Sequence, residues 1–242
     1  MPDDDIEVDA TNLVVEWGAL RLSGPGLVRL TSDILEFQSR AGVTLRMDYE
    51  ELAGGAWRTG SLTIHGGAGG SRVLVEASRG LEFAWIQLLQ RVCPLPEVAR
   101  GHRLLGSRRG GSVDAQARFL APLMQARRRI ESEADLEARV AAIEARALRE
   151  RIAVSLQAIA RDAYPGSHPD QRGLEAELEE AMAPFFAGLD AMESAATRFR
   201  TAPETIRFIA WREWVSAVST AFALADSGWA SAARLLPGSF RP

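Results

Sequence analysis

The chain has 242 residues, of which 47% are hydrophobic and 25% charged, and its formal net charge is −4. These values are typical of a globular protein with one or two domains and a sizeable core, and they argue against a disordered or fibrous chain. All 28 basic residues are arginine and none is lysine, which we attribute to a GC-rich, bacterial genome and not to a selected function.

The cysteine content and the N-terminal composition indicate in which cellular compartment the protein is expected. Cys93 is the only cysteine, which excludes an intrachain disulfide and a multi-cysteine zinc site. Residues 1–9 are acidic, so we expect them to stay solvated, and they do not resemble a signal peptide. No run of about 18 apolar residues could form a membrane-spanning helix. We therefore expect a cytoplasmic protein.

The residue pattern at 12–77 is typical of short strands joined by turns. Short apolar runs alternate with turn residues roughly every 8–12 positions, which is typical of an antiparallel sandwich or barrel. The expected strands are 13–15, 19–22, 27–31, 34–37, 43–47, 61–64 and 72–76. We expect a tight turn at residues 23–26, a chain break at residues 53–56 and a glycine-rich hairpin loop at residues 66–70.

The hydrophobic period changes after Ser78. Leu81, Leu88 and Val92 recur at helical spacing, so an amphipathic helix is expected to run to about Val92, where Pro94 follows.

The remaining chain is predicted to be helical, in a bundle of four or five helices. A first helix is capped by Ser112 or Asp114 and contains Pro122 at its start or at a kink. The next is expected to be a single helix over residues 133–164. A third starts at Ser167 and is kinked at Pro184.

A capping box at residues 201–204 predicts the start of another helix, which we expect to end near Gly228. A last short helix would then hold Trp229 and Leu236. Trp211 and Trp214 are three residues apart, so they are expected to share a buried helix face.

Residues 12–93 resemble a pleckstrin-homology-like (PH-like) domain. The resemblance rests on Leu-Thr-Ser-Asp-Ile-Leu-Glu-Phe at 30–37, Tyr-Glu-Glu-Leu-Ala-Gly at 49–54, Leu-Thr-Ile at 62–64 and the helix that contains Trp85. It implies about seven strands closed by one helix, and a binding module instead of an enzyme. Phosphoinositide-binding members have a basic cluster around the first hairpin loop. Here the expected loop has only Arg21 and Arg29 beside it, so no lipid-binding residue is carried over.

The predicted fold class is therefore α+β: an N-terminal PH-like antiparallel β-barrel or sandwich capped by a helix, followed by an all-α helical bundle. The expected domains are the PH-like domain at 10–95, a linker at 96–111 and the bundle at 112–236.

The residues that usually carry catalysis do not form a motif. His65, His102 and His168 lack metal-ligand spacing, and the glycines at 66–70 lack the lysine of a phosphate-binding loop. Carboxylates on the expected helices fit a solvated face better than a dimetal site. We predict a non-enzymatic protein with no cofactor, no metal and no small-molecule substrate.

The one basic feature is the junction at residues 101–130, where seven arginines and one acid give a net charge of +6. Arginines there can hold phosphates or an acidic partner, or they can pair with neighbouring carboxylates, which we favour. The candidate binding residues are Arg100, Arg103, Arg108, Arg109, Arg118, Arg127, Arg128 and Arg129. The favoured function is a protein-binding scaffold that acts through the PH-like domain or the bundle. The alternative is an anion-binding module for nucleic acid or a membrane surface, using the arginines at 100–129.

Overall fold

The computed structural model describes residues 5–67, 70–94, 111–133, 135–164 and 169–236. Contacts between residues divide the chain into two units. The sheet unit contains Met1–Pro94 together with Thr201–Arg212, and the helical unit contains Leu95–Arg200 and Glu213–Pro242. The fold is α+β, as the sequence predicts: seven antiparallel strands precede the helical part of the described chain.

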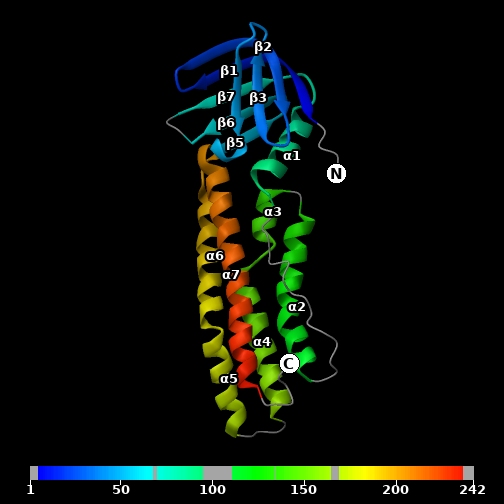
Figure 1. Cartoon of the computed structure of the whole chain (residues 1–242), viewed down its shortest axis with the longest axis vertical. Helices are drawn as coiled ribbons and strands as arrows, with labels where there is room; N and C mark the ends of the chain where they lie inside the picture. Colours follow the sequence, from blue (N-terminus) through cyan, green and yellow to red (C-terminus); the bar gives the residue numbers. More distant parts are fainter. Residues whose placement is uncertain (1–4, 68–69, 95–110, 134, 165–168, 237–242) are drawn as a thin grey trace. The chain divides into compact units, whose positions relative to one another are not determined.

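The sheet unit is a curled antiparallel sheet with strand order β4-β3-β2-β1-β7-β6-β5 (Figure 1). Its strands are β1 (Ile6–Trp17), β2 (Leu20–Leu30), β3 (Ile34–Ser39), β4 (Thr44–Asp48), β5 (Leu52–Arg58), β6 (Ser61–Gly66) and β7 (Arg72–Glu76). The short 3₁₀ helix η1 (Tyr49–Glu51) joins β4 to β5.

Strand β1 pairs with β2 along its length and with β7 from Asn12 to Glu16. The buried positions alternate at Val8 and Ala10 and then shift by one residue to Leu13 and Val15. The register of the β1–β2 pair shifts at the same place. Such a bulge bends a strand and increases its twist, which lets one strand serve both halves of a curled sheet.

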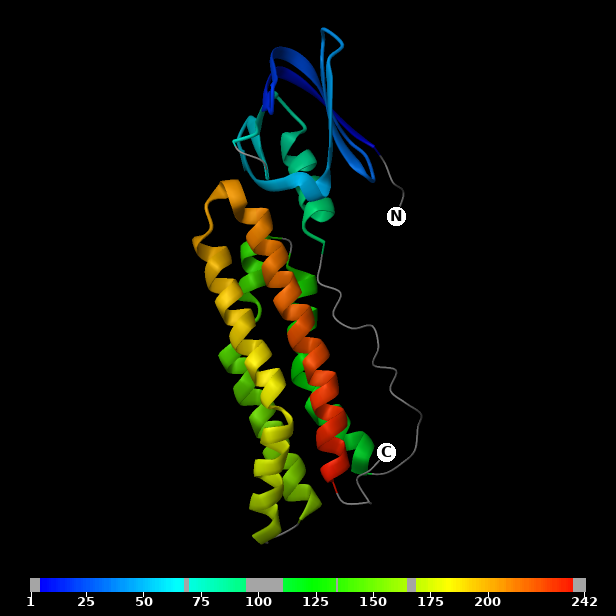
Figure 2. The ribbon, with the colours of Figure 1, turned by 60° about the vertical axis from the view of Figure 1, so that its left-hand side comes forward.

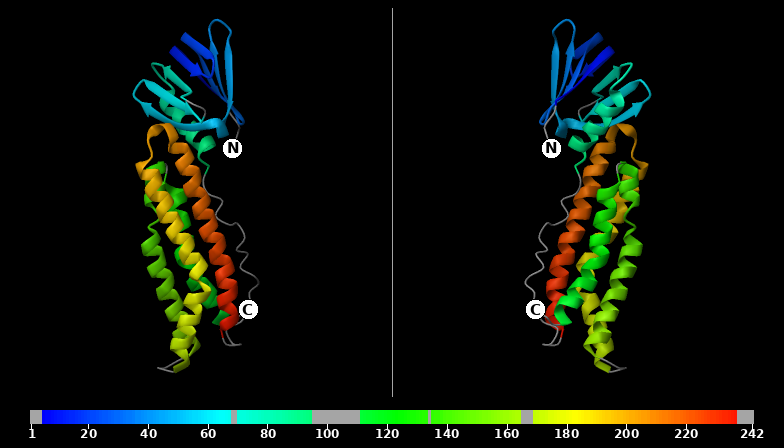
Figure 3. Two further views of the ribbon diagram at one scale, coloured as in Figure 1. Left: turned by 90° about the vertical axis from the view of Figure 1, so that its left-hand side faces the viewer. Right: turned by 90° about the vertical axis from the view of Figure 1, so that its right-hand side faces the viewer.

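Helix α1 (Leu81–Val92) forms where the sequence predicts it. It lies against the concave side of the curled sheet in two opposite views (Figure 3). Its buried side chains, Leu81, Ala84, Leu88 and Val92, recur every three or four residues and complete the core of the sheet unit.

Two predictions for this unit are wrong. Residues 23–26 do not form a turn but continue β2, and the first hairpin reverses at Gly18, whose φ is +56°. Gly26 is required inside the strand because an added Cβ would lie 2.5 Å from the carbonyl oxygen of Gln38 on β3. The expected break at residues 53–56 is the centre of β5. Residues 6–9 are the first residues of β1, and the acidic side chains of Glu7 and Asp9 are exposed, as expected.

The helical unit contains α2 (Gly111–Ser132), α3 (Leu136–Ala141), α4 (Ala145–Ala163), α5 (Pro169–Ala181), α6 (Ala183–Thr201) and α7 (Arg207–Leu235), and the first turns of α7 belong to the sheet unit. The 3₁₀ helix η2 (Glu204–Ile206) connects α6 to α7. Within this unit, α6 runs beside α7, and α2 and α5 each contact α4 (Figure 2). Phe119 of α2 stacks on Trp229 of α7 with ring centroids 4.8 Å apart.

The single helix predicted at 133–164 is two helices. Residues 142–144 are not helical, and Ile143 in this break and Ala145 at the start of the next helix are both buried. The described chain therefore breaks between α3 and α4, and Asp135 caps α3 by accepting a hydrogen bond from the amide of Ala138 at 3.0 Å.

Other helix boundaries also differ from prediction. The helix expected to kink at Pro184 is interrupted at Met182, giving α5 and α6. Helix α7 continues through Gly228 to Leu235. Glycine is needed at position 228 because an added Cβ would lie 2.8 Å from the sulfur of Met182. With these breaks the described part of the bundle has six helices, more than the four or five expected. Trp211 and Trp214 are buried, which confirms the prediction for them.

Candidate partner-binding groove

An open groove lies between α2 and α4 of the helical unit. It has a volume of about 970 Å³. Its walls come from positions three or four residues apart on each helix, among them Arg118, Gln125 and Arg128 of α2 and Arg151 of α4. This spacing follows from the helical period: the opposite face of α2, with Phe119 and Leu123, is buried in the core.

The floor of the groove is apolar and made of small side chains. Ala121 and Pro122 contribute from α2, and Ala147, Val154 and Ala158 from α4. Val154 is 64% exposed, the largest value among the exposed large hydrophobic residues of the described chain. Small residues let a partner backbone approach closely, and an exposed valine there has apolar surface left to bury.

The arginines of the groove differ in their contacts. Arg118 forms an ion pair with Asp162 of α4. Arg151 donates a hydrogen bond from Nη1 to Oε1 of Gln125 at 3.0 Å, which ties α4 to α2. Arg128 is exposed, and its guanidinium contacts no hydrogen-bonding or charged group of the described residues. The groove therefore presents one guanidinium that is free to bind a carboxylate or phosphate.

A second hollow of about 410 Å³ continues the groove toward α3. It shares Pro122, Ala147 and Arg151 with the first and adds Arg129 and Glu133. Arg129 is exposed, and among the described residues its side chain also has no polar partner. The two hollows therefore border one another at these three shared residues.

Four of the eight candidate arginines predicted from the sequence lie in the described residues. Arg118, Arg128 and Arg129 line the two hollows, while Arg127 is partly exposed on the same helix and has a contact of its own within the described residues. Arg100, Arg103, Arg108 and Arg109 lie outside the described residues. The expected pairing with carboxylates holds for Arg118, although its partner Asp162 is on α4 and not on the adjoining segment.

Sequence analysis missed Arg151 and Val154. Both lie on α4, three residues apart, so they share one face. Val154 was detectable because it falls outside the apolar seam formed by Ile152, Leu156 and Ile159, all of which are buried.

One of the three histidines lies in the described residues. His65 lies on β6, and its pKa is lowered, first by burial and then by the neighbouring charge of Arg72. In the described parts of the chain, no three histidine, cysteine or carboxylate side chains are grouped closely enough to hold a metal ion. None of the described helices combines the length and hydropathy required to span a membrane.

No protein-family model matches the chain, and no curated protein matches it significantly.

Proposed function

We propose that the chain is a non-enzymatic protein-binding scaffold, whose α2–α4 groove holds an acidic amphipathic helix of another protein. The observation that carries this proposal is the groove itself, where alanine, proline and an exposed valine lie between Arg118 and Arg128 of α2 and Arg151 of α4. Helix-in-groove recognition needs these two properties, an apolar floor for the buried face of the partner and polar rims for its edges.

The charges favour an acidic partner. Arg118, Arg128 and Arg151 outnumber Glu150 on the walls. Arginine suits such a rim because its planar fork can hold two carboxylate oxygens at once. The apolar floor and Arg128 then act together: Val154 is covered while a partner carboxylate meets the one wall guanidinium that has no acceptor in the described chain.

We also propose that the sheet unit is a PH-like domain. Three features support this proposal together with the sequence resemblance: the curled seven-stranded antiparallel sheet, the strand β1 shared by both halves of the curl and the helix α1 that follows β7. It adds to the argument for a binding protein, although fold alone does not determine function.

An anion-binding function is the alternative. It is favoured by Arg128 and Arg129, which are exposed and have no acidic partner among the described residues. The ligand would be nucleic acid or an anionic membrane surface. Binding to a polyphosphate releases counterions and falls steeply with salt, whereas a groove with an apolar floor responds weakly.

The test compares two probes on the full-length protein by fluorescence anisotropy at 50 and 300 mM salt. One is a labelled amphipathic peptide with glutamates on its polar face, and the other is a single-stranded DNA oligonucleotide. Val154→Glu should weaken peptide binding about tenfold, since it places a charge on the apolar floor. Arg128→Glu should weaken it to a similar extent.

Arg172→Glu is the matched control, because Arg172 is an exposed helical arginine of α5 outside the groove. It should leave the affinity unchanged. Tight oligonucleotide binding that is insensitive to Val154→Glu and steeply salt-dependent would replace the proposed function with the anion-binding one.

A further inference from the structure

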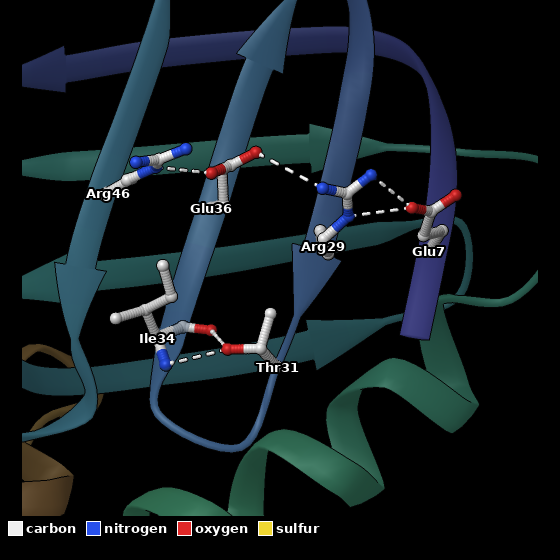
Figure 4. A network of polar contacts seen from close by, with 6 residues as sticks. All are labelled: Glu7, Arg29, Thr31, Ile34, Glu36 and Arg46. Atoms are coloured by element: carbon white, nitrogen blue, oxygen red, sulfur yellow. Dashed lines mark hydrogen bonds and ion pairs between the residues drawn. The ribbon is translucent and has the colours of Figure 1, made fainter. Parts of the chain in front are cut away.

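Four charged side chains form a row across the outer face of the sheet unit. Glu7 of β1, Arg29 of β2, Glu36 of β3 and Arg46 of β4 lie opposite one another in successive pairs of the sheet (Figure 4). Arg29 donates from Nε to Glu7 Oε1 at 2.7 Å, and Arg46 donates from Nε to Glu36 Oε2 at 2.6 Å. Nη1 of Arg29 also lies 3.9 Å from Oε1 of Glu36, so the charged contacts run without a gap from Glu7 to Arg46.

The signs in this row alternate strictly, negative, positive, negative and positive, from β1 to β4. Glu36 is only 7% exposed because the two arginines cover it. Within the described residues the row ends at Arg46, whose side chain is 69% exposed and pairs with Glu36. Cross-strand pairs of opposite charge stabilise a sheet, so the next position beyond Arg46 is suited to a carboxylate.

The inner face at the same strand is apolar and incompletely covered. Val43 is 39% exposed and Leu45 is partly exposed, while Met47 is buried. Leu45 and Met47 alternate with Arg46 along β4, so they face the concave side of the sheet, and Val43 directly precedes the strand. A further strand beside β4 would therefore place its own apolar residues next to Val43 and Leu45.

The two edges of the sheet differ in whether a neighbour covers them. On β5, residues 204–206 approach the strand closely, and Arg212 donates to the carbonyl oxygens of Tyr49 and Leu52 at 2.8 and 3.1 Å. On β4, the only strand paired within the described residues is β3. The outer backbone groups of β4 are therefore the ones left to accept another strand.

We propose that the edge of β4 is a second partner-binding surface, which takes up an extended peptide as an eighth strand. The peptide alternates apolar and acidic residues: a carboxylate continues the charge row opposite Arg46, and the flanking apolar side chains cover Val43 and Leu45. Main-chain hydrogen bonds supply affinity in this mode, and the alternate side chains supply specificity. The surface is separate from the α2–α4 groove and does not depend on its function.

The experiment is an NMR titration of the isotope-labelled full-length protein with the heptapeptide Thr-Val-Glu-Val-Glu-Val-Thr. Its partner probe has lysine in place of both glutamates. Amide shifts should concentrate at residues 43–48, and the wild-type protein should prefer the acidic peptide. Arg46→Glu should weaken acidic-peptide binding about fivefold and strengthen lysine-peptide binding by a similar factor, since a cross-strand charge pair contributes up to about this ratio.

Arg79→Glu is the control, because Arg79 is exposed, precedes α1 and lies outside the charge row. It should leave both affinities unchanged, and amide shifts of the unbound variants check that each remains folded. Equal binding of both peptides to wild type and to Arg46→Glu would overturn the proposal. So would shifts confined to residues 118–158, which would assign the peptide to the groove instead.

Discussion

The two edge strands of the sheet differ in how their unpaired backbone groups are protected. Among the residues that the structure describes, both β4 and β5 have one side with no strand neighbour, and such a side exposes backbone hydrogen-bonding groups. Strand β5 is covered by residues 201–212, which belong to the same unit although they follow it by about 150 positions. Strand β4 is short, and it has Arg46 and Asp48 on its exposed face.

The difference lies in how closely a neighbour can approach. An added Cβ on Gly54 would lie 1.8 Å from the carbonyl oxygen of Glu204, so only glycine permits this contact. Next to it, Gly55 leaves room for Trp85 and Phe208, whose rings stack with centroids 6.0 Å apart. Strand β4 has no glycine, and its charged side chains instead discourage non-specific strand pairing. The covered edge strand β5 thus has glycine where a neighbour approaches, and the uncovered edge strand β4 has charged side chains that discourage non-specific pairing.

The largest effect is expected from Gly54→Ala. The new methyl group would collide with backbone atoms of Glu204 and Thr205, which cannot move as a flexible side chain could. We expect a loss of more than about 3 kcal/mol in the free energy of unfolding, at the upper end of the range for overpacked sites. Urea denaturation followed by circular dichroism measures it.

Gly67→Ala is the matched control, since its Cβ would lie 3.7 Å from the nearest atom, the carbonyl oxygen of Glu51, which is ordinary contact. It should change stability by less than about 1 kcal/mol. Similar midpoints for the two variants would mean that residues 204–206 do not press on β5.

A smaller effect is expected from Arg212→Gln. The guanidinium donates three hydrogen bonds, to the carbonyl oxygens of Tyr49, Leu52 and Glu50, at 2.8, 3.1 and 3.3 Å. Hydrogen bonds from a charged donor contribute strongly, so we expect a loss of about 1.5–3 kcal/mol. Arg234→Gln, an exposed arginine near the end of the same helix, should shift stability by no more than about 0.5 kcal/mol in the same assay. A loss no larger than that of the control would show that β5 is held without Arg212.

Local periodicity predicted much of the fold. The spacing of Leu81, Leu88 and Val92 located α1 at both ends, because one helix face packs on the sheet and the period is not interrupted. The glycines at 53–56 and at 23–26 led to wrong predictions of a chain break and a turn, because glycine usually marks a turn. Here Gly54 and Gly26 are required by close approach of distant backbone, and sequence alone does not disclose which segments meet.

The candidate site was predicted only in part. The charge pattern identified Arg118, Arg128 and Arg129, because clusters of like charge are visible in the sequence. Arg151 was missed because it lies outside the basic segment at 101–130, and the sequence does not show that α4 packs beside α2. The row from Glu7 to Arg46 was missed because it depends on the register of four strands.

The smallest effect should be the pH dependence that His65 contributes at the covered edge. Burial lowers its pKa, as does the charge of Arg72, while Glu204 acts in the opposite direction. Its ordinary value is 6.5. As pH falls through this value, the histidine of the unfolded chain takes up a proton before the folded one does. The unfolded state then binds more protons, so the free energy of unfolding decreases as pH falls and levels off below the folded pKa.

His65→Gln should therefore remove part of the stability loss between pH 7 and pH 5, measured by urea denaturation at several pH values. Glu204→Gln sharpens the test, because without that carboxylate the pKa of His65 should fall further, as read from the NMR titration of its ring. The imidazole signal that disappears in His65→Gln identifies the residue. If the ring instead titrates above 6.5 in the wild-type protein, Glu204 outweighs burial at this edge, and the covered strand would gain stability in acid.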